Sequence, residues 1–206
     1  MIKNLIFDFG NVLYDLDESL TESKLREVLD PHKTADLFEQ VLHPFERGEI
    51  SEEAFFNRLQ RRSRDVRDGS YYYEAWNAML LGMPAHRFEW LKQIRKNYKV
   101  YLLSNINITH LRAVRKNIKM QTGILDFELH YFDKVYYSFE IGFRKPELKC
   151  FEYVLNDAGI IGKETLFIDD KVENIKGASE AGLHAKLHMP ELKIEEQMEN
   201  YLYEFH

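Results

Sequence analysis

The stretch LIFDFGNVLYDLD, residues 5–17, decides how the rest of the chain is interpreted. Leu5, Ile6 and Phe7 form a short apolar run that is typical of a buried strand, and Asp8 stands where that strand would end. A buried carboxylate costs free energy unless a partner compensates its charge, so an acid at this position needs a reason. The stretch therefore predicts a first strand that ends at a functional site.

Four further apolar segments resemble strands, and helical patterns separate them. The strand candidates are residues 98–104, 134–138, 165–169 and 183–187. Between them, apolar residues recur at helical spacings of three and four, as in Leu111, Val114 and Ile118. Strands that alternate with helices predict an α/β fold, a Rossmann-like parallel sheet with helices on both faces.

Residues 18–80 interrupt this alternation, because their apolar patterns are helical and none is a convincing strand. The last of these helical segments is SYYYEAWNAMLL, residues 70–81. A helical block between the first strand and the remaining α/β alternation predicts an inserted, all-helical cap. We expect a core domain of residues 1–17 and 82–206 and a cap domain of residues 18–81, with a hinge near Asp17 and Gly82.

Composition narrows the class of partner. The chain has 206 residues, a formal net charge of -6 and a pI near 5.8, which disfavours nucleic acid and anionic membranes. Its one cysteine, Cys150, excludes an internal disulfide and a thiolate metal site. With no apolar run of membrane-spanning length and no secretion signal in the sequence, we expect a cytoplasmic protein. The oligomeric state stays open.

Polar residues stand at the ends of three predicted strands. Asp8 follows the first, Ser104 and Asn105 end the second, and Asp169 and Asp170 end another. Ligands of open parallel sheets bind at the carboxyl ends of the strands, so these side chains are expected to meet in one crevice. Each acid alone could instead cap a loop or a helix, but three such strand ends favour a shared site.

Charge indicates the chemistry of this site. Asp8, Asp169 and Asp170 would repel one another and raise each other's pKa unless a cation lay between them. Carboxylate oxygens without Cys or His suit Mg²⁺, which often also binds a phosphate. Together with Lys145, which precedes a predicted helix, such an ion would make an acidic site accept a phosphoryl group.

Four short motifs occur in a fixed order along nearly the whole chain: FDFGNV, LLSN, RKP and FIDDKVEN. In this order and placement they resemble the haloacid dehalogenase (HAD)-like hydrolase superfamily, in its phosphatase branch with a cap inserted after the first motif. The segments FERGEIS and GFRKPE also resemble the small sugar-phosphate phosphatases typified by alpha-D-glucose-1-phosphate phosphatase.

The resemblance implies a role for each motif residue. Asp8 would attack phosphorus and form an aspartyl-phosphate, which water then hydrolyses. Lys145 would offset negative charge on this nucleophile and on the phosphate. Ser104 and the backbone amide of Asn105 would bind the phosphoryl oxygens. Arg47 would close over the substrate from the cap, an interpretation that the resemblance favours slightly over an ordinary pair with a neighbouring acid.

The resemblance also implies the Mg²⁺ ligands. Asp8, the backbone carbonyl of Gly10 and Asp170 would bind the ion, and Asp169 and Asn174 would support these ligands from behind. Many relatives carry Asp where this chain has Asn174, so we do not expect that amide to bind the metal directly.

Gly10 departs from the family pattern, in which most phosphatases carry an aspartate that moves a proton. Glycine still supplies the carbonyl but not the acid. Dehalogenases of the superfamily also lack that aspartate, whereas the pair Asp169–Asp170 favours a metal. We interpret Gly10 as a specialisation of proton transfer. Asp15 and Asp17 are candidates for a replacement acid, or are ordinary loop and helix-start residues.

The sequence thus predicts a Mg²⁺-dependent phosphatase that acts on a small phosphorylated metabolite, with a sugar phosphate as the first candidate. Two alternatives remain open. One is a metal-independent dehalogenase-type hydrolase, whose activity would survive a chelator. The other is a non-catalytic phosphate-binding or interaction protein that lost turnover at Gly10.

Overall fold

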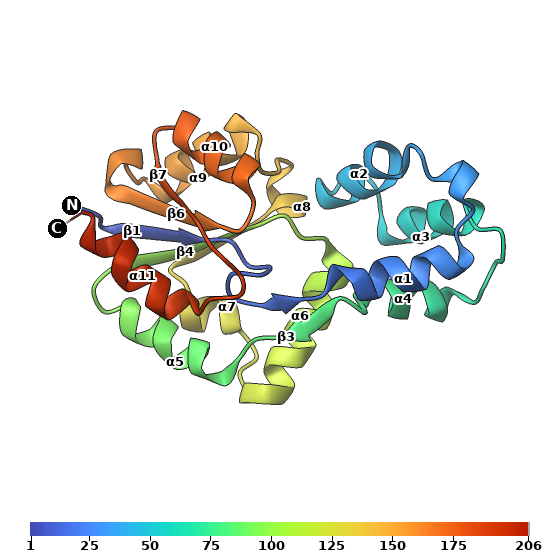
Figure 1. Ribbon diagram of the computed structural model, residues 1–206, viewed down its shortest axis with the longest axis horizontal. Coiled ribbons are helices and arrows are strands. Elements are labelled where there is room, and N and C mark those ends of the chain that lie inside the picture. The colour runs from blue at the N-terminus through green and yellow to red at the C-terminus, as the bar shows by residue number, and fades with distance from the viewer. Residues whose placement is uncertain (206) are drawn as a thin grey trace.

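Five parallel strands in the order β5-β4-β1-β6-β7 form the centre of the larger lobe (Figure 1). Their bounds are β1 Asn4–Phe7, β4 Lys99–Ser104, β5 Lys134–Tyr137, β6 Thr165–Asp169 and β7 His184–Leu187. This computed structural model describes residues 1–205. The Rossmann-like prediction is confirmed, and all five strands lie where the apolar segments predicted them.

Helices cover both faces of the sheet, so the central strands are buried on both sides and read as continuous apolar runs. Leu5 and Phe7 of β1 face one layer, and Ile6 faces the other. The first layer contains α5 (Ala85–Ile94), α6 (Ile108–Thr122), α7 (Phe127–Tyr131) and α11 (Ile194–Tyr203). The second layer contains α9 (Leu148–Ala158) and α10 (Val172–Glu180), and Cys150 is buried in it.

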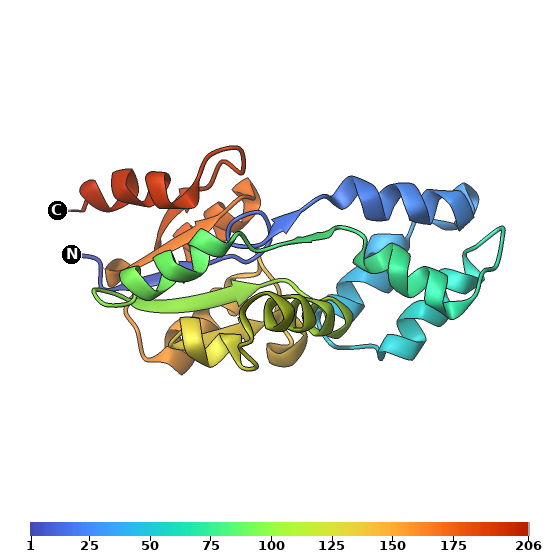
Figure 2. The same cartoon turned by 90° about the horizontal axis from the view of Figure 1, so that it is seen from below.

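The smaller lobe is a helical block with its own apolar core, which Figures 1 and 2 show at one end of the molecule. Aromatic side chains fill this core: the Phe45 and Phe55 rings stack with centroids 4.1 Å apart, and Trp76 packs against Phe55. Its elements are α1 (Glu18–Val28), η1 (Pro31–Lys33), η2 (Phe38–Leu42), α2 (His43–Glu46), α3 (Glu52–Arg61) and α4 (Gly69–Asn77).

A two-stranded antiparallel ribbon joins the lobes, and it corrects the sequence analysis. The helix expected over residues 70–81 ends at Asn77, and Leu80–Gly82 instead forms β3, paired with β2 (Asp15–Leu16). This pairing satisfies backbone groups that a longer helix would have satisfied internally. The expectation of no strand within residues 18–80 was therefore wrong at Leu80, and the expected helix was wrong at Leu80 and Leu81. The ribbon lies at the two chain crossings, beside Asp17 and Gly82.

Three helices were not predicted: the short α7 and α8 (Ser138–Ile141), and the ten-residue α11. None of the helices in residues 1–205 combines the length and the apolar composition that a membrane span requires.

His110 lies on α6 where this helix meets α4 of the smaller lobe. Its ring stacks on Trp76, and its Nε2 lies 2.9 Å from the Trp76 carbonyl oxygen. Its Nδ1 lies 3.2 Å from the Asn107 side-chain amide nitrogen, which can only donate. The neutral imidazole satisfies both contacts, and burial lowers the pKa of His110 to about 4.

We predict that acid destabilises the protein partly through His110. Its pKa rises from about 4 in the folded chain to 6.5 on unfolding, so unfolded chains bind more protons between these values. The free energy of unfolding is therefore unaffected by His110 above pH 6.5. It decreases as pH falls from 6.5 towards 4, by up to about 3 kcal/mol. Denaturant unfolding at several pH values should show a smaller acid-induced loss in His110→Gln than in wild type. The control is His32→Gln at an exposed histidine, and parallel wild-type and His110→Gln curves would contradict the assignment.

Candidate active site

The strand register brings the predicted polar residues to one edge of the sheet. Phe7 of β1 lies opposite Leu102 of β4 on one side and Ile168 of β6 on the other. Asp8, the next residue, donates its backbone N–H to the Ile168 carbonyl at 2.8 Å. Ser104 ends β4 and Asp169 ends β6, so the side chains expected at three strand ends do share one edge. All three are buried.

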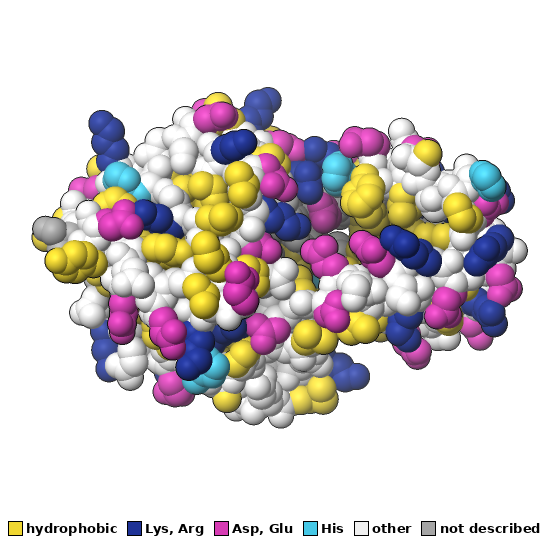
Figure 3. All heavy atoms as spheres, in the orientation of Figure 1, with side chains coloured by type: hydrophobic (Ala, Val, Ile, Leu, Met, Phe, Trp, Pro, Cys, Tyr) yellow, Lys and Arg dark blue, Asp and Glu magenta, His cyan; other side chains and the backbone are white. Residues whose placement is uncertain are grey.

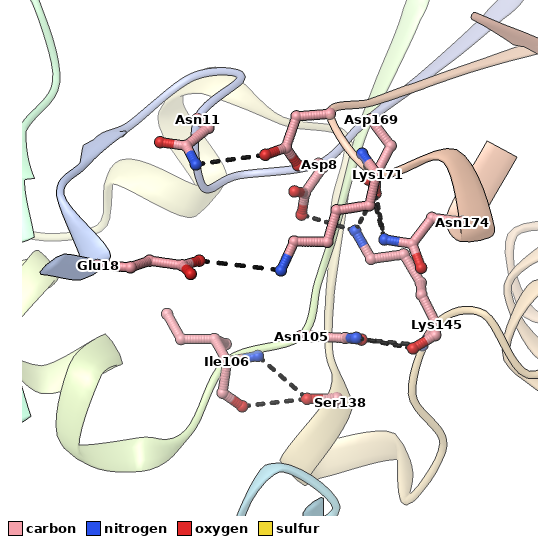
Figure 4. Close-up of polar contacts among 11 residues, drawn as sticks. Asp8, Asn11, Glu18, Asn105, Ile106, Ser138, Lys145, Asp169, Lys171 and Asn174 are labelled. Atoms are coloured by element: carbon pink, nitrogen blue, oxygen red, sulfur yellow. Dashed lines mark hydrogen bonds and ion pairs between the residues drawn. The ribbon is translucent and has the colours of Figure 1, made fainter. Parts of the chain in front are cut away.

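Lys145 connects two of these acids. Its Nζ lies 2.6 Å from Asp8 Oδ1 and 2.6 Å from Asp169 Oδ2, and the residue is 1% exposed (Figure 4). The Asn105 side chain holds the Lys145 backbone from both sides, since its amide donates to the Lys145 carbonyl and its oxygen accepts from the Lys145 N–H. The motif predicted a role for the Asn105 backbone only, and these two side-chain hydrogen bonds were not predicted.

Asp169 and Asp170 are adjacent in sequence but differ in their surroundings. Asp169 accepts hydrogen bonds from Lys145, from the Asn174 amide at 2.9 and 3.0 Å, and from the Lys171 backbone at 2.9 Å. Asp170 Oδ2 accepts one bond, from Asn11 at 3.2 Å. Asp170 Oδ1 is buried and has no hydrogen-bond partner within residues 1–205. The neighbours of Asp169 use both of its oxygens, whereas Asp170 has one left for a ligand.

Burial and neighbouring charges shift the pKa values of Asp8, Asp170 and Lys145. Burial raises the pKa of Asp8 to about 7; the Lys145 charge opposes this shift, and the Asp169 and Asp170 charges add to it. Burial likewise raises the pKa of Asp170, and Asp169 adds to the rise. Burial alone would lower the pKa of Lys145, but the charges of Asp169 and Asp8 outweigh it and raise that pKa. Three carboxylates against one ammonium leave the site short of positive charge.

The donor set fits the divalent cation that the sequence predicted. One oxygen from each of Asp8, Asp169 and Asp170 can be chosen so that all lie within 4.8 Å of one another. Oxygen ligands without sulfur or imidazole suit Mg²⁺, and the orphaned Asp170 Oδ1 lacks the partner that a buried carboxylate oxygen requires. The Gly10 carbonyl and the exact share of each acid in metal binding stay predictions.

Arg47 lies at the end of α2 and pairs with Glu147 of the larger lobe. Beside it, Glu46 accepts a hydrogen bond from Arg144 at 2.9 Å. Two ion pairs thus connect the smaller lobe to residues near Lys145, and the smaller lobe supplies the cation in one and the anion in the other. In the space-filling view, side chains of both signs meet where the lobes adjoin (Figure 3). The structure thus gives Arg47 an acidic partner, and its contact with a substrate stays a prediction.

The two candidate replacement acids have partners of their own. Asp15 lies 2.6 Å from Arg87 in an ion pair, and Asp17 caps α1 by accepting from the Ser19 backbone and hydroxyl. Both contacts match the alternative interpretation as loop and helix-start residues.

A model of the haloacid dehalogenase-like hydrolase family matches residues 2–182. The chain belongs to this family. D-ribitol-5-phosphate phosphatase from Bacteroides thetaiotaomicron is 29% identical over 193 residues, which cover 88% of this chain and 89% of that relative. Sesquiterpene phosphatase from Aspergillus oryzae is 27% identical over 184 residues, covering 88% and 87%. This HAD-like hydrolase therefore has phosphatase relatives that it matches over most of their length.

Solved structures agree with this placement. A HAD-family enzyme from Bacteroides thetaiotaomicron superposes with a TM-score of 0.84 at 30% identity, covering 96% of this chain and 98% of that chain. A point mutant of that enzyme, solved with magnesium and inorganic phosphate, gives a TM-score of 0.81 at 31% identity, covering 94% and 97%. The likeness to glucose-1-phosphate phosphatases stays a prediction.

We predict that Asp170→Asn weakens Mg²⁺ binding more than Asp169→Asn. Both changes keep the shape of the side chain, but Asp170 has an oxygen free for a ligand, whereas Lys145 and Asn174 already occupy those of Asp169. Calorimetric titration with Mg²⁺ measures both affinities, and thermal unfolding without metal shows whether each variant is folded. Equal losses, or the reverse order, would contradict this division of roles.

Proposed function

We propose that this protein is a Mg²⁺-dependent phosphatase that hydrolyses a small phosphorylated metabolite, with sugar phosphates as the first class to test. The observation that carries the proposal is the site's charge: Asp8 shares a buried lysine with Asp169, beside an Asp170 oxygen with no partner among the described residues. A site with this excess of carboxylates favours a divalent cation and, with the cation bound, an anionic substrate. The phosphatase relatives support the same reaction class.

In the proposed reaction, an Asp8 oxygen attacks phosphorus, and the bond from phosphorus to the leaving oxygen breaks. Water then attacks the aspartyl-phosphate and releases phosphate, which regenerates the carboxylate. Lys145 Nζ, 2.6 Å from Asp8 Oδ1, holds the nucleophile in place and offsets charge on the transferring group. Ser104 and the Asn105 backbone N–H bind the phosphoryl oxygens.

Asp8, Asp170 and the Gly10 carbonyl would hold Mg²⁺, while Asp169 and Asn174 fix the surroundings. The ion supplies positive charge that lets the phosphoryl group approach three carboxylates. A dehalogenase needs no such charge, so the acidic excess favours phosphoryl transfer over that alternative. The raised pKa of Asp8 favours an active site over a passive binding module, because strongly shifted pKa values are common at catalytic sites.

Residues 18–81 would form a cap domain over a core of residues 1–17 and 82–206. Two observations support this division. The smaller lobe has a separate apolar core, and the chain passes between the lobes at both strands of the β2–β3 ribbon. Arg47 would then contact the substrate by exchanging its ion pair with Glu147 for one with the substrate phosphate.

We predict that Asp8→Asn abolishes phosphatase activity and keeps the fold. An amide cannot form the acyl-phosphate, and loss of the nucleophile should lower kcat by at least about a thousandfold. The assay is phosphate release from a panel of phosphorylated metabolites, with Mg²⁺ and with a chelator. Asp126→Asn at an exposed aspartate is the control.

Three results would count against the proposal. Substantial activity in Asp8→Asn would remove the nucleophile from Asp8. Turnover that survives the chelator would favour the metal-independent alternative, and phosphate binding without turnover of any substrate would favour the non-catalytic one. Thermal unfolding of Asp8→Asn confirms that lost activity is not lost structure.

Gly10 generates a second prediction, about the leaving group. Its φ lies outside the left-handed region, so other residues fit its backbone, but an added Cβ would lie 2.6 Å from Leu16 Cδ1. The apolar Leu16 side chain thus lies where an acid at position 10 would begin. Without an acid there, a basic alkoxide leaves slowly, and we expect wild type to prefer sugar 1-phosphates over 6-phosphates.

The test adds the acid and makes room for it. Gly10→Asp combined with Leu16→Ala should narrow the gap in kcat/KM between sugar 1-phosphates and 6-phosphates by about tenfold or more. Gly10→Asn with Leu16→Ala, which has the same shape but no acid, is the matched control, and D-ribitol 5-phosphate belongs in the panel as a primary-alcohol substrate. An unchanged gap would mean that Gly10 does not select the leaving group. A wider gap in Asp15→Asn or Asp17→Asn would assign the proton to that residue.

A further inference from the structure

We propose that Asn11 is a positioning residue that aims Asp170 at the cation. The proposal rests on the proposed function, since it concerns how the metal ligand is held. It concerns a side chain for which the sequence predicted no role, although a Gly-Asn dipeptide such as Gly10–Asn11 after a strand is a turn signal.

The backbone of Asn11 narrows the choice of residue. Asn11 has φ 57 and, within residues 1–205, is the one non-glycine residue with positive φ. Only glycine and, to a lesser degree, asparagine and aspartate adopt this conformation readily. Glycine would therefore serve the backbone at least as well, so the asparagine side chain needs a reason of its own.

Two hydrogen bonds fix the orientation of that side chain. Asn11 Oδ1 accepts from the Leu16 backbone N–H at 3.3 Å, which turns the amide nitrogen to the other side. There Nδ2 donates to Asp170 Oδ2 at 3.2 Å, the dashed line that leaves Asn11 in Figure 4. With Oδ2 held, the second oxygen of Asp170 stays buried without a partner in the described part of the chain.

Charge explains why an amide suits this position. Lys145 already pairs with Asp8 and Asp169. Within residues 1–205, Asp170 takes its only side-chain hydrogen bond from a neutral group, the Asn11 amide. A cationic donor would compete with the metal for Asp170, and a second carboxylate would repel it. A neutral donor orients the carboxylate and leaves its charge for the ion. Because the same amide binds Leu16 of β2, it also ties the metal ligand to the ribbon that joins the lobes.

The test compares Asn11→Gly with Asn11→Ala. Both remove the two side-chain hydrogen bonds, but only alanine is strained at φ 57, so Asn11→Ala should melt at a lower temperature than Asn11→Gly. Calorimetric titration of the whole protein with Mg²⁺, without substrate, should show affinity about tenfold weaker in both variants. In steady-state assays the concentration of Mg²⁺ for half-maximal rate should rise by the same factor, while kcat at saturating Mg²⁺ stays within about threefold.

Asn117→Ala is the matched control. Asn117 donates to the Tyr14 hydroxyl at 2.9 Å, and the Tyr14 carbonyl accepts from the Asn11 backbone, so this change loosens the same loop without touching Asp170. We expect its Mg²⁺ affinity to equal that of wild type.

Each other outcome is decisive. Wild-type affinity in Asn11→Gly would overturn the assignment, and so would an equal loss in Asn117→Ala. Unfolding of Asn11→Gly would also overturn it, because the side chain would then be structural. Wild type that binds no Mg²⁺ would overturn the proposed function itself, a result that the titration of wild type alone reveals.

Discussion

The Lys145 ammonium between Asp8 and Asp169 is the interaction on which the site depends. Each of these charges would be costly to bury alone, and each is tolerable because the others are present. The three residues come from distant segments, 137 and 24 positions apart, so the pairing exists only in the assembled sheet. Removing Lys145 would leave the buried Asp8 and Asp169 carboxylates without their shared cation and would destabilise the fold. Neutralising Asp8 alone leaves the ammonium paired with Asp169.

The surrounding structure keeps this lysine in place. The Asn105 amide holds the Lys145 backbone, and helix α10 packs close to the next residue because position 177 is glycine. A Cβ at Gly177 would lie 2.4 Å from the Pro146 carbonyl oxygen, a backbone atom that cannot turn aside. The small residue in α10 therefore serves the placement of the loop that carries the ammonium.

The sequence was informative wherever one segment determines its own structure. Buried parallel strands are apolar runs that need no alternation, and β6 occupies residues 165–169 as predicted. It was uninformative where a partner decides: Leu80–Gly82 continues a helical pattern but forms β3, because Asp15–Leu16 lies beside it. Short helices such as α7 also escaped, since five residues carry too little periodicity to distinguish them.

The same division holds for the site. Strand ends and motifs predicted where Asp8, Asp169 and Asp170 would meet, because parallel strands share one carboxyl edge. The strand ends and motifs did not predict which side chains form hydrogen bonds or ion pairs with one another. The contact of Asn11 with Asp170 spans 159 positions and that of Arg47 with Glu147 spans 100, and a short motif contains no information about such pairs.

The ion pairs of the site differ in strength according to their exposure. Lys145 is 1% exposed, so its contacts with Asp8 and Asp169 are strongly coupled to the fold. The pairs of Arg47 and Glu46 across the lobes are partly solvated, and such pairs contribute about 0.2–1 kcal/mol each. Water can replace these outer contacts at little cost. Separating the lobes at this edge would therefore break the weak pairs around Lys145 while the buried pair between Lys145 and Asp8 stays intact.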